Sequence, residues 1–269
     1  MDPLVDDLLA ETADLVSLLR PLDEAGWDTP TPAPGWTVRD QVSHLAYFDE
    51  MSVAAVNDPE RFTGERAELA NRGSAYVDDV AARHRHLTGA ELLAWFTHAR
   101  DELAELARGM DPKARVPWYG PDMGALSFLT ARLMETWAHG QDVADGLGVD
   151  REATPRLRHV CHLGVRAIPN SYLVRGLRPP ETPIRVELAG PDGEAWTWGP
   201  EDAADAVRGP ALDFCLVVTQ RRHPDDTGLV TRGPVASEWI SIAQAFAGPP
   251  GPGRRPGQFR RDQPSEERP

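Results

Sequence analysis

Glu135 and His139 are the residues of this chain whose types and spacing most directly suggest chemistry. They lie four positions apart in the stretch LSFLTARLMETWAHGQDVADGLG, and on an α-helix such positions lie one turn apart on the same face. A carboxylate oxygen and an imidazole nitrogen can therefore reach one divalent ion. His44, in a second helical stretch, TVRDQVSHLAYFDE, is the best candidate for a third ligand from a facing helix. Two histidines and one glutamate, with an open fourth position, form a known ligand set for catalytic zinc, so ligand type favours zinc as the metal.

The helix predicted around this pair has a polar stripe and an apolar stripe side by side. Glutamate and histidine at this spacing occur by chance on many helices and usually form only a solvated pair. Here little of the helix is left to face water, and such a helix can hold polar groups inside a bundle, as bundle metal sites do. Asp142, one turn beyond His139, is either a fourth ligand or a group that orients an imidazole. The polar stripe consists of Phe128, Arg132, Glu135, His139, Asp142 and Gly146, and the apolar stripe of Leu129, Leu133, Gly140, Val143 and Leu147.

Several segments of the chain resemble a known family. The segment APGWTVRDQVSHLAYFDE and the later ETWAHGQDVADGLG are similar to the DinB-like superfamily of metal-binding four-helix bundles, and specifically to mycothiol-dependent maleylpyruvate isomerases. The segments RVELAGPDGEAWTWGP and GPALDFCLVVTQRR are similar to that family's small C-terminal α+β domain. The resemblance implies that His44, Glu135 and His139 bind the metal and that mycothiol, or a similar low-molecular-weight thiol, is the cofactor. It further implies a cis–trans isomerase or thiol transferase that acts on a small electrophilic substrate such as maleylpyruvate.

Two other functions stay open for the same residues. In a metal hydrolase, the open position holds hydroxide and Asp142 or another carboxylate acts as the base. In a non-catalytic metal-binding or ligand-carrying protein, the metal only braces the bundle. A structural zinc site is normally closed by four protein ligands, and three are evident here, which favours catalysis.

Arg221 and Arg222 end the segment LVVTQRR. Tandem arginines at a helix end usually form a solvated C-terminal turn that the helix dipole favours. Alternatively, a guanidinium can bind a substrate carboxylate through two parallel hydrogen bonds, which lysine cannot do. The family resemblance implies an arginine of the small domain near the metal, and Arg221 is the position that matches best, with Arg222 as the alternative.

Other histidines show weaker patterns. His84 and His86 lie at alternate positions of a predicted helix, where side chains point away from each other, so we expect them on a solvated face. His159 and His162 form an i, i+3 pair that could bind metal in principle, but the sequence suggests no third ligand for them.

The spacing of apolar residues and of capping residues predicts the elements that position the site. An amphipathic helix precedes residue 20, and Thr37 with Asp40 approximates a capping box at the start of the helix that carries His44. Thr88 with Glu91 repeats this pattern, and Gly148 is placed to end the Glu135–His139 helix. Beyond these, residues 184–198 alternate as a β-hairpin with a PDG turn. These elements, together with the architecture that the family resemblance implies, predict an α+β fold with a metal-binding four-helix bundle over 1–178, a small α+β domain over 179–249 and a disordered tail over 250–269.

Composition and charge exclude some classes of partner. The chain has 269 residues, 41% of them hydrophobic, and a formal net charge of −14, which opposes binding to nucleic-acid phosphates. The sequence shows no long apolar run and no basic leader, so we expect a cytoplasmic protein without membrane partners. Cys161 and Cys215 fit buried reduced thiols better than a disulfide. A small-molecule substrate and a thiol are the expected partners, and the sequence indicates no oligomeric state.

Overall fold

A computed structural model describes residues 1–259 and has the α+β fold predicted from the sequence: an N-terminal helical domain and a C-terminal α+β region. The chain divides into two compact units. The first comprises Met1–Glu152 with Ala247–Pro249, and the second comprises Ala153–Phe246 together with the described residues 250–259. The last ten positions of the predicted disordered tail lie outside the described residues.

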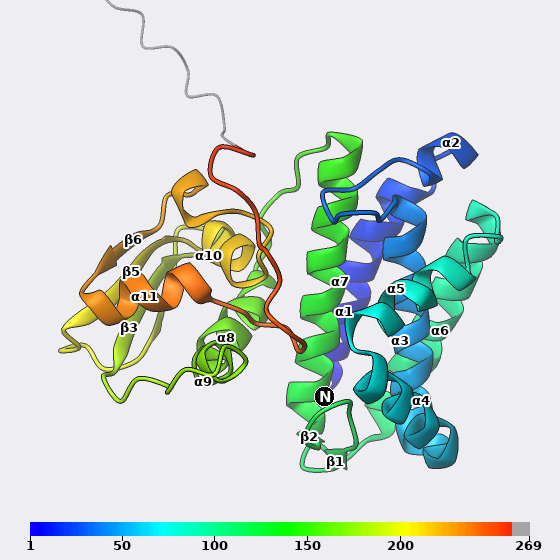
Figure 1. Cartoon of the computed structure of the whole chain (residues 1–269), viewed down its shortest axis with the longest axis horizontal. Coiled ribbons are helices and arrows are strands. Elements are labelled where there is room, and N and C mark those ends of the chain that lie inside the picture. The colour runs from blue at the N-terminus through cyan, green and yellow to red at the C-terminus, as the bar shows by residue number, and fades with distance from the viewer. Residues whose placement is uncertain (260–269) are drawn as a thin grey trace, which may run out of the picture. The chain divides into compact units, whose positions relative to one another are not determined.

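Four long helices of the first unit form a bundle, coloured from blue to green in Figure 1. Both α1 and α3 pack against α6 and α7, so each helix has two neighbours. Apolar side chains at helical spacing fill the interior, as the amphipathic pattern requires. The helices are α1 (Asp2–Leu19), α3 (Val38–Asn57), α6 (Gly89–Gly109) and α7 (Ala125–Leu147). One core cluster consists of Leu15, Val16, Leu19, Trp27, Val38, Val42, Leu45, Ala46, Leu92, Phe96 and Val143.

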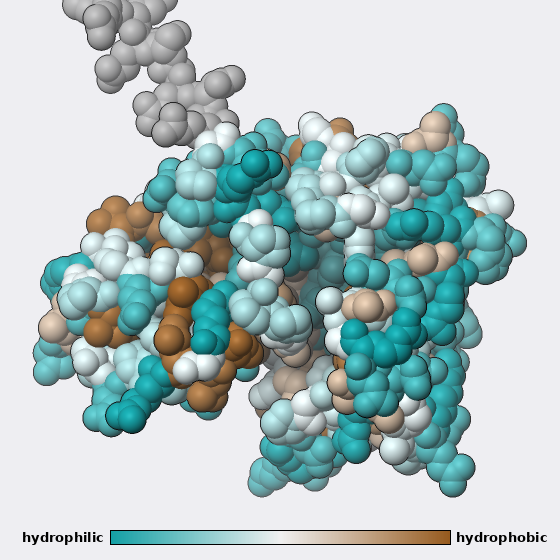
Figure 2. Space-filling view, viewed as in Figure 1, coloured by the Kyte–Doolittle hydropathy of each residue, from teal (hydrophilic) through white to brown (hydrophobic). Residues whose placement is uncertain are grey.

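Shorter elements connect the bundle helices. They are α2 (Glu24–Trp27), α4 (Pro59–Arg72), α5 (Ser74–Arg83) and the antiparallel pair β1 (Arg115–Val116) and β2 (Met123–Gly124). Helices α4 and α5 pack on α3 and present a mostly hydrophilic surface in the view of Figure 2. Among residues 1–259, none of the helices combines the length and the apolar character that a membrane span needs.

Local signals set the ends of the helices as predicted. The Asp40 carboxylate accepts a hydrogen bond from the backbone N–H of Thr37 at 2.9 Å, and the Glu91 carboxylate accepts one from Thr88 at 2.7 Å. These bonds satisfy backbone donors that the first turn of a helix leaves open. Gly148 ends α7 in the left-handed conformation, with φ of 66°.

The C-terminal unit contains a four-stranded sheet in the order β4-β3-β5-β6. The predicted hairpin is confirmed, because β3 and β4 pair antiparallel. Strand β5 lies parallel to β3 on its other side, and β6 pairs antiparallel with β5; the sequence analysis missed both of these strands. The strands are β3 (Ile184–Ala189), β4 (Ala195–Trp198), β5 (Asp205–Pro210) and β6 (Val230–Arg232), with helices α8 (Leu157–Arg166), α9 (Ile168–Leu173), α10 (Ala211–Val218), α11 (Pro234–Ile242) and the 3₁₀ turn η1 (Pro224–Asp226).

The division between the units falls after residue 152, whereas the sequence analysis placed it at 178. Helix α8 packs against α10 of the sheet domain, and the close fit depends on Gly164, where an added Cβ would lie 2.9 Å from the Val218 side chain. Cys161 and Cys215 are buried between these helices with their Sγ atoms 3.4 Å apart. Periodicity alone cannot show which domain a helix packs on. In Figure 2, apolar residues gather around α8 and α9, where Leu173 and Leu177 are exposed.

Candidate metal centre

The three predicted ligands meet between α3 and α7. One ligand atom from each of His44, Glu135 and His139 can be chosen so that all lie within 4.8 Å of one another. The rings of the two histidines have their centroids 4.3 Å apart, and His139 Nε2 lies 3.2 Å from Glu135 Oε2. Packing of α3 on α7 thus joins a histidine to a pair about ninety residues further along the chain, as expected from the sequence.

The orientation of His139 is set by Gln41, one turn before His44 on α3. The Gln41 side-chain oxygen lies 2.5 Å from His139 Nδ1 and can only accept, so Nδ1–H donates. The Gln41 amide nitrogen in turn donates to Thr31 Oγ1 at 2.8 Å, which fixes which end of the amide faces the imidazole. The sequence analysis did not identify Gln41, although an amide one turn before a ligand histidine is the kind of signal that could have pointed to it.

A loop before α3 anchors this chain of hydrogen bonds. Thr31 donates through both its backbone N–H and its hydroxyl to the carbonyl oxygen of Trp36, at 2.8 and 2.9 Å. The loop can lie close to α7 because residue 146 is a glycine: an added Cβ there would be 2.9 Å from the carbonyl oxygen of Pro30. Gly146, part of the polar stripe seen in the sequence, therefore allows a close approach and supplies no ligand.

The donor set fits a divalent cation. Because Nδ1 of His139 donates to Gln41, Nε2 is the nitrogen left to face Glu135, and it presents a lone pair whenever the ring is neutral. That lone pair and the Glu135 carboxylate are two acceptors 3.2 Å apart, an arrangement that requires a proton or a cation between or beside them. An additional imidazole, His44, within the same cluster matches the two-histidine, one-glutamate set of open zinc sites. A hydrogen-bonded outer partner such as Gln41 is also typical of histidines that bind metals.

Aromatic rings enclose the imidazoles. The Trp36 ring lies 5.4 Å from that of His44 and 6.0 Å from that of His139, and it stacks on the latter. The Phe48 ring lies 4.6 Å from that of His44. Trp36 is held by a hydrogen bond from its Nε1 to Asp78 at 2.9 Å. These rings limit the access of water to one end of the cluster.

Other residues considered in the sequence analysis lie outside the cluster. Asp142 is buried on α7 but is not part of the group of converging ligand atoms. His86 is exposed, as predicted. The prediction was wrong for His84, whose ring packs 4.6 Å from Trp95 and whose pKa is lowered by burial. Packing against an aromatic neighbour is a tertiary effect that the alternate spacing could not show.

Arg221 and Arg222 belong to the C-terminal unit, just after α10. Gln220 has a positive φ of 59°, uncommon for a residue with a side chain, and the backbone N–H of Arg221 donates to the carbonyl of Leu216 at 2.7 Å. This is a left-handed helix end without the usual glycine. Both arginines are half-buried, and the Arg222 guanidinium lies 3.9 Å from the centroid of the Phe259 ring. The role of Arg221 stays a prediction.

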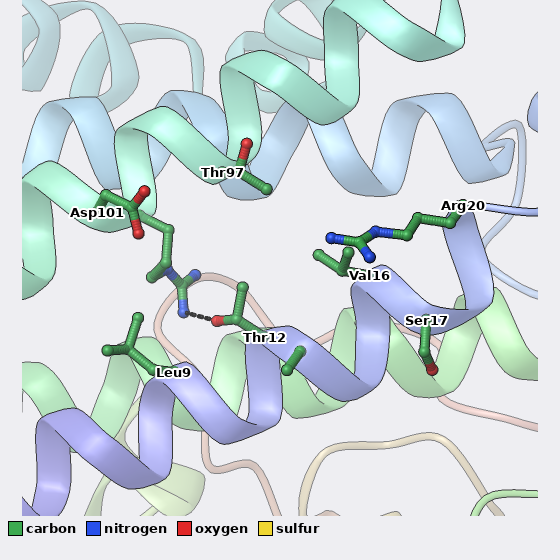
Figure 3. A pocket seen from close by; sticks show the side chains of 9 residues that line it. Leu9, Thr12, Val16, Ser17, Arg20, Thr97 and Asp101 are labelled. Atoms are coloured by element: carbon green, nitrogen blue, oxygen red, sulfur yellow. Dashed lines mark hydrogen bonds between the residues drawn. The ribbon is translucent and has the colours of Figure 1, made fainter.

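A separate groove of about 560 Å³ runs between α1 and α6 (Figure 3). Its described lining contains a single carboxylate, from Asp101, and neither imidazole nor thiol, so it lacks the donor set of the cluster. Arg100, one of its lining residues, donates a hydrogen bond to Thr12 at 3.0 Å, and this bond is the dashed line that ends at Thr12 in Figure 3.

Comparison with known proteins connects this geometry to a family. A profile described as the mycothiol maleylpyruvate isomerase N-terminal domain matches residues 8–144, and one described as wyosine base formation matches residues 180–232. Uncharacterized proteins from two strains of Mycobacterium tuberculosis are each 47% identical over 252 residues, covering 94% of this chain and 98% of the relative.

The fold is also similar to solved structures. Two crystal structures of the mycothiol-dependent maleylpyruvate isomerase, one of a variant with a histidine replaced by alanine, match with a TM-score of 0.57 and 16% identity. The match covers 86% of this chain and 92% of the other. The protein is thus maleylpyruvate isomerase-like in fold, and by its N-terminal domain the chain belongs to the mycothiol maleylpyruvate isomerase family.

Proposed function

We propose that the protein is a metal-dependent enzyme that uses mycothiol or a similar low-molecular-weight thiol to isomerise, or to transfer sulfur to, a small electrophilic substrate such as maleylpyruvate. The observation that carries the proposal is the convergence of His44, Glu135 and His139 within 4.8 Å, in a chain of this family. The three side chains hold a divalent ion, with zinc favoured by the ligand set.

The chain's own residues prepare the site for thiol chemistry. When bound, a divalent ion lowers the pKa of a thiol beside it, so that thiolate is present near neutral pH. Gln41 keeps Nε2 of His139 available as a ligand, and the rings of Trp36 and Phe48 limit the access of water. A site with three protein ligands leaves room for the thiol, which a closed four-ligand site does not.

The proposed isomerisation balances without an added oxidant or reductant. The thiolate sulfur adds to the double bond of a cis-enone acid, and the displaced π electrons move onto the conjugated carbonyl as an enolate. After rotation about the resulting single bond, the enolate re-forms the double bond in the trans form and expels the thiolate. If the enolate is protonated on carbon instead, the sulfur stays on the product, and the outcome is S-transfer.

Arg221 is proposed to bind a carboxylate of the substrate. A guanidinium offers two parallel N–H donors that match the two oxygens of a carboxylate. The left-handed Gln220 directs the backbone that leads into Arg221, and functional positions often retain such a conformation. Arg222 is the alternative residue for binding the carboxylate, and its guanidinium contacts the Phe259 ring.

The test combines a metal assay of the purified protein with a screen of thiol consumption against maleylpyruvate and related unsaturated acids. Stoichiometric metal together with turnover that requires the thiol supports the proposal. Turnover that needs the metal but no thiol would indicate a hydrolase. Metal that can be removed without losing any activity or ligand binding would indicate a non-catalytic metal-binding protein.

A further inference from the structure

A cluster of charged side chains lies inside the bundle beside the proposed metal site. Asp49 on α3 binds two arginines: its Oδ2 accepts from Arg100 Nε at 2.8 Å, and its Oδ1 accepts from Arg132 Nε at 3.0 Å. All three residues are almost fully buried, with at most 3% of their surface exposed. The neighbouring Glu11 forms its own ion pair with Arg151. Asp49, Arg100 and Arg132 together carry one net positive charge, which the nearby Glu11 offsets in part at Arg100, and a buried positive charge is costly unless an anion lies close to it.

The two arginines use their donors differently. Arg100 on α6 donates from Nε to Asp49, from Nη1 to Thr12 and from Nη2 to Thr136. Arg132 on α7 donates from Nε to Asp49 and from Nη2 to the carbonyl of Leu45, and its Nη2 also lies 2.9 Å from Asp49 Oδ1 as an ion pair. Within residues 1–259, no hydrogen bond from Arg132 Nη1 accompanies these. The Nε, Nη1 and Nη2 groups of Arg100 thus all bind other side chains of the bundle. Arg132 can still donate from Nη1 to another acceptor.

Arg132 lies on the same side of α7 as the proposed ligands. It precedes Glu135 by three positions and His139 by seven, so the three residues share one helix face. On α3, its partners Leu45 and Asp49 flank the turn that follows His44. The guanidinium therefore lies about one helical turn, roughly 5 Å, from the metal cluster along both helices.

A second donor lies nearby in the loop between β1 and β2. The Tyr119 hydroxyl is buried and has no hydrogen-bond partner among the described residues. Its ring contacts Phe48 edge-on at 5.5 Å, and Phe48 in turn packs against His44. Burial raises the pKa of Tyr119, the charges of Tyr76 and Glu65 add to this, and the positive charge of Arg132 opposes it. The hydroxyl therefore stays protonated at physiological pH and can donate to an anion.

We propose that Arg132 and Tyr119 form an anion subsite that binds one carboxylate of the substrate. A carboxylate bound there adds negative charge beside the arginine pair and accepts a hydrogen bond from the Tyr119 hydroxyl, which has no partner among the described residues. This proposal rests on the proposed function for the identity of the substrate. It requires the substrate to be a dicarboxylate, with one carboxylate bound by Arg132 and Tyr119 and the reactive double bond at the metal cluster. A buried guanidinium discriminates strongly for a carboxylate, because its field is weakly screened there.

The test compares two Tyr-to-Phe variants of the full-length protein. Maleate, a small dicarboxylate, is titrated calorimetrically into the protein in the absence of any thiol, with and without added Zn²⁺. Tyr119→Phe should weaken maleate binding about tenfold in both conditions, as loss of a hydrogen bond to a charged group predicts. Its melting temperature should not fall, because the deleted hydroxyl has no described protein partner. Tyr76→Phe makes the same change where the hydroxyl binds Glu65 and Tyr47, so it should lower the melting temperature and leave maleate binding intact.

A further variant separates an anion subsite from a purely structural arginine. Arg132→Lys keeps the charge but loses the planar fork, so it should weaken binding of maleate more than binding of its monomethyl ester. Native maleate affinity in both Tyr119→Phe and Arg132→Lys would overturn the subsite. If maleate binds without metal and its affinity falls in both variants, the subsite is supported. If thiol-dependent turnover is absent at the same time, the proposed reaction fails and the subsite stands.

Discussion

Gln41 on α3 accepts a hydrogen bond from Nδ1 of His139 on α7, so one bundle helix sets the orientation of a proposed ligand on its neighbour. This bond leaves Nε2 facing the carboxylate of Glu135. Metal-binding histidines commonly have such an outer partner, which fixes the tautomer and the ring angle. The geometry of the cluster is therefore built into the packing of α3 on α7.

Loss of either histidine should abolish metal binding. His44→Ala or His139→Ala leaves two of the three ligands, which cannot retain the ion against water. Metal content of the purified variants, measured by plasma mass spectrometry, should fall from about one ion per chain to background. His86→Ala, at an exposed position outside the cluster, serves as the control and should keep its metal. Full metal content in both cluster variants would refute the ligand assignment.

Gln41→Leu should weaken metal binding without removing any ligand. The imidazole of His139 then loses the partner that fixes its tautomer, and such changes typically cost about 10- to 100-fold in affinity. Calorimetric titration with Zn²⁺ measures the effect. Gln141→Leu is the matched control, since that amide donates to Asp145 and not to an imidazole. Equal affinities for the two variants would show that Gln41 has only a packing role.

Glu135→Gln tests the charge of the site. The amide keeps the shape of the carboxylate but removes its negative charge, so metal affinity should fall and the pKa of a bound water or thiol should drop. The metal dissociation constant and the pH dependence of thiol consumption report these two effects. Unchanged affinity together with an unchanged pH profile would assign Glu135 a structural role.

Arg221→Lys tests the small domain. The substitution keeps the charge and loses the two-pronged geometry, so turnover should fall by about one to two orders of magnitude, or roughly 1.5–3 kcal/mol. Metal content and melting temperature should hardly change. Rates are compared for a carboxylate substrate and its methyl ester. An equally large defect with both would mean that Arg221 does not bind the carboxylate, and Arg222 would be tested next.

Asp49→Asn should strongly destabilise the bundle. The change leaves Arg100 and Arg132 buried without their shared counter-ion, and breaking a buried pair in this way costs about 3–5 kcal/mol. Urea denaturation followed by circular dichroism measures the free energy of unfolding. Asp101→Asn, next to Arg100 on α6 but exposed, should change it little. A near-native Asp49→Asn protein would show that the interior tolerates two unpaired guanidiniums.

The local features of this protein could be predicted from its amino-acid sequence. The four-residue spacing of Glu135 and His139 places both on one helix face, and Thr37 with Asp40, Thr88 with Glu91 and Gly148 mark helix ends. These are short-range effects, set by backbone geometry and by hydrogen bonds between residues a few positions apart. His44 could be named as a partner because its helix and its motif were both readable.

The contacts between distant groups could not be predicted from the sequence, because they depend on tertiary packing. The bond between Gln41 and His139, the sharing of Asp49 by two arginines and the packing of residues 153–178 with the sheet domain all join segments far apart in the chain. Strand β5 likewise owes its place to direct parallel pairing with β3, although β4 lies between them in the sequence. Periodicity shows that a residue faces a neighbour but not which neighbour, because that choice depends on the fit of whole surfaces and on buried charges that balance only in the folded chain.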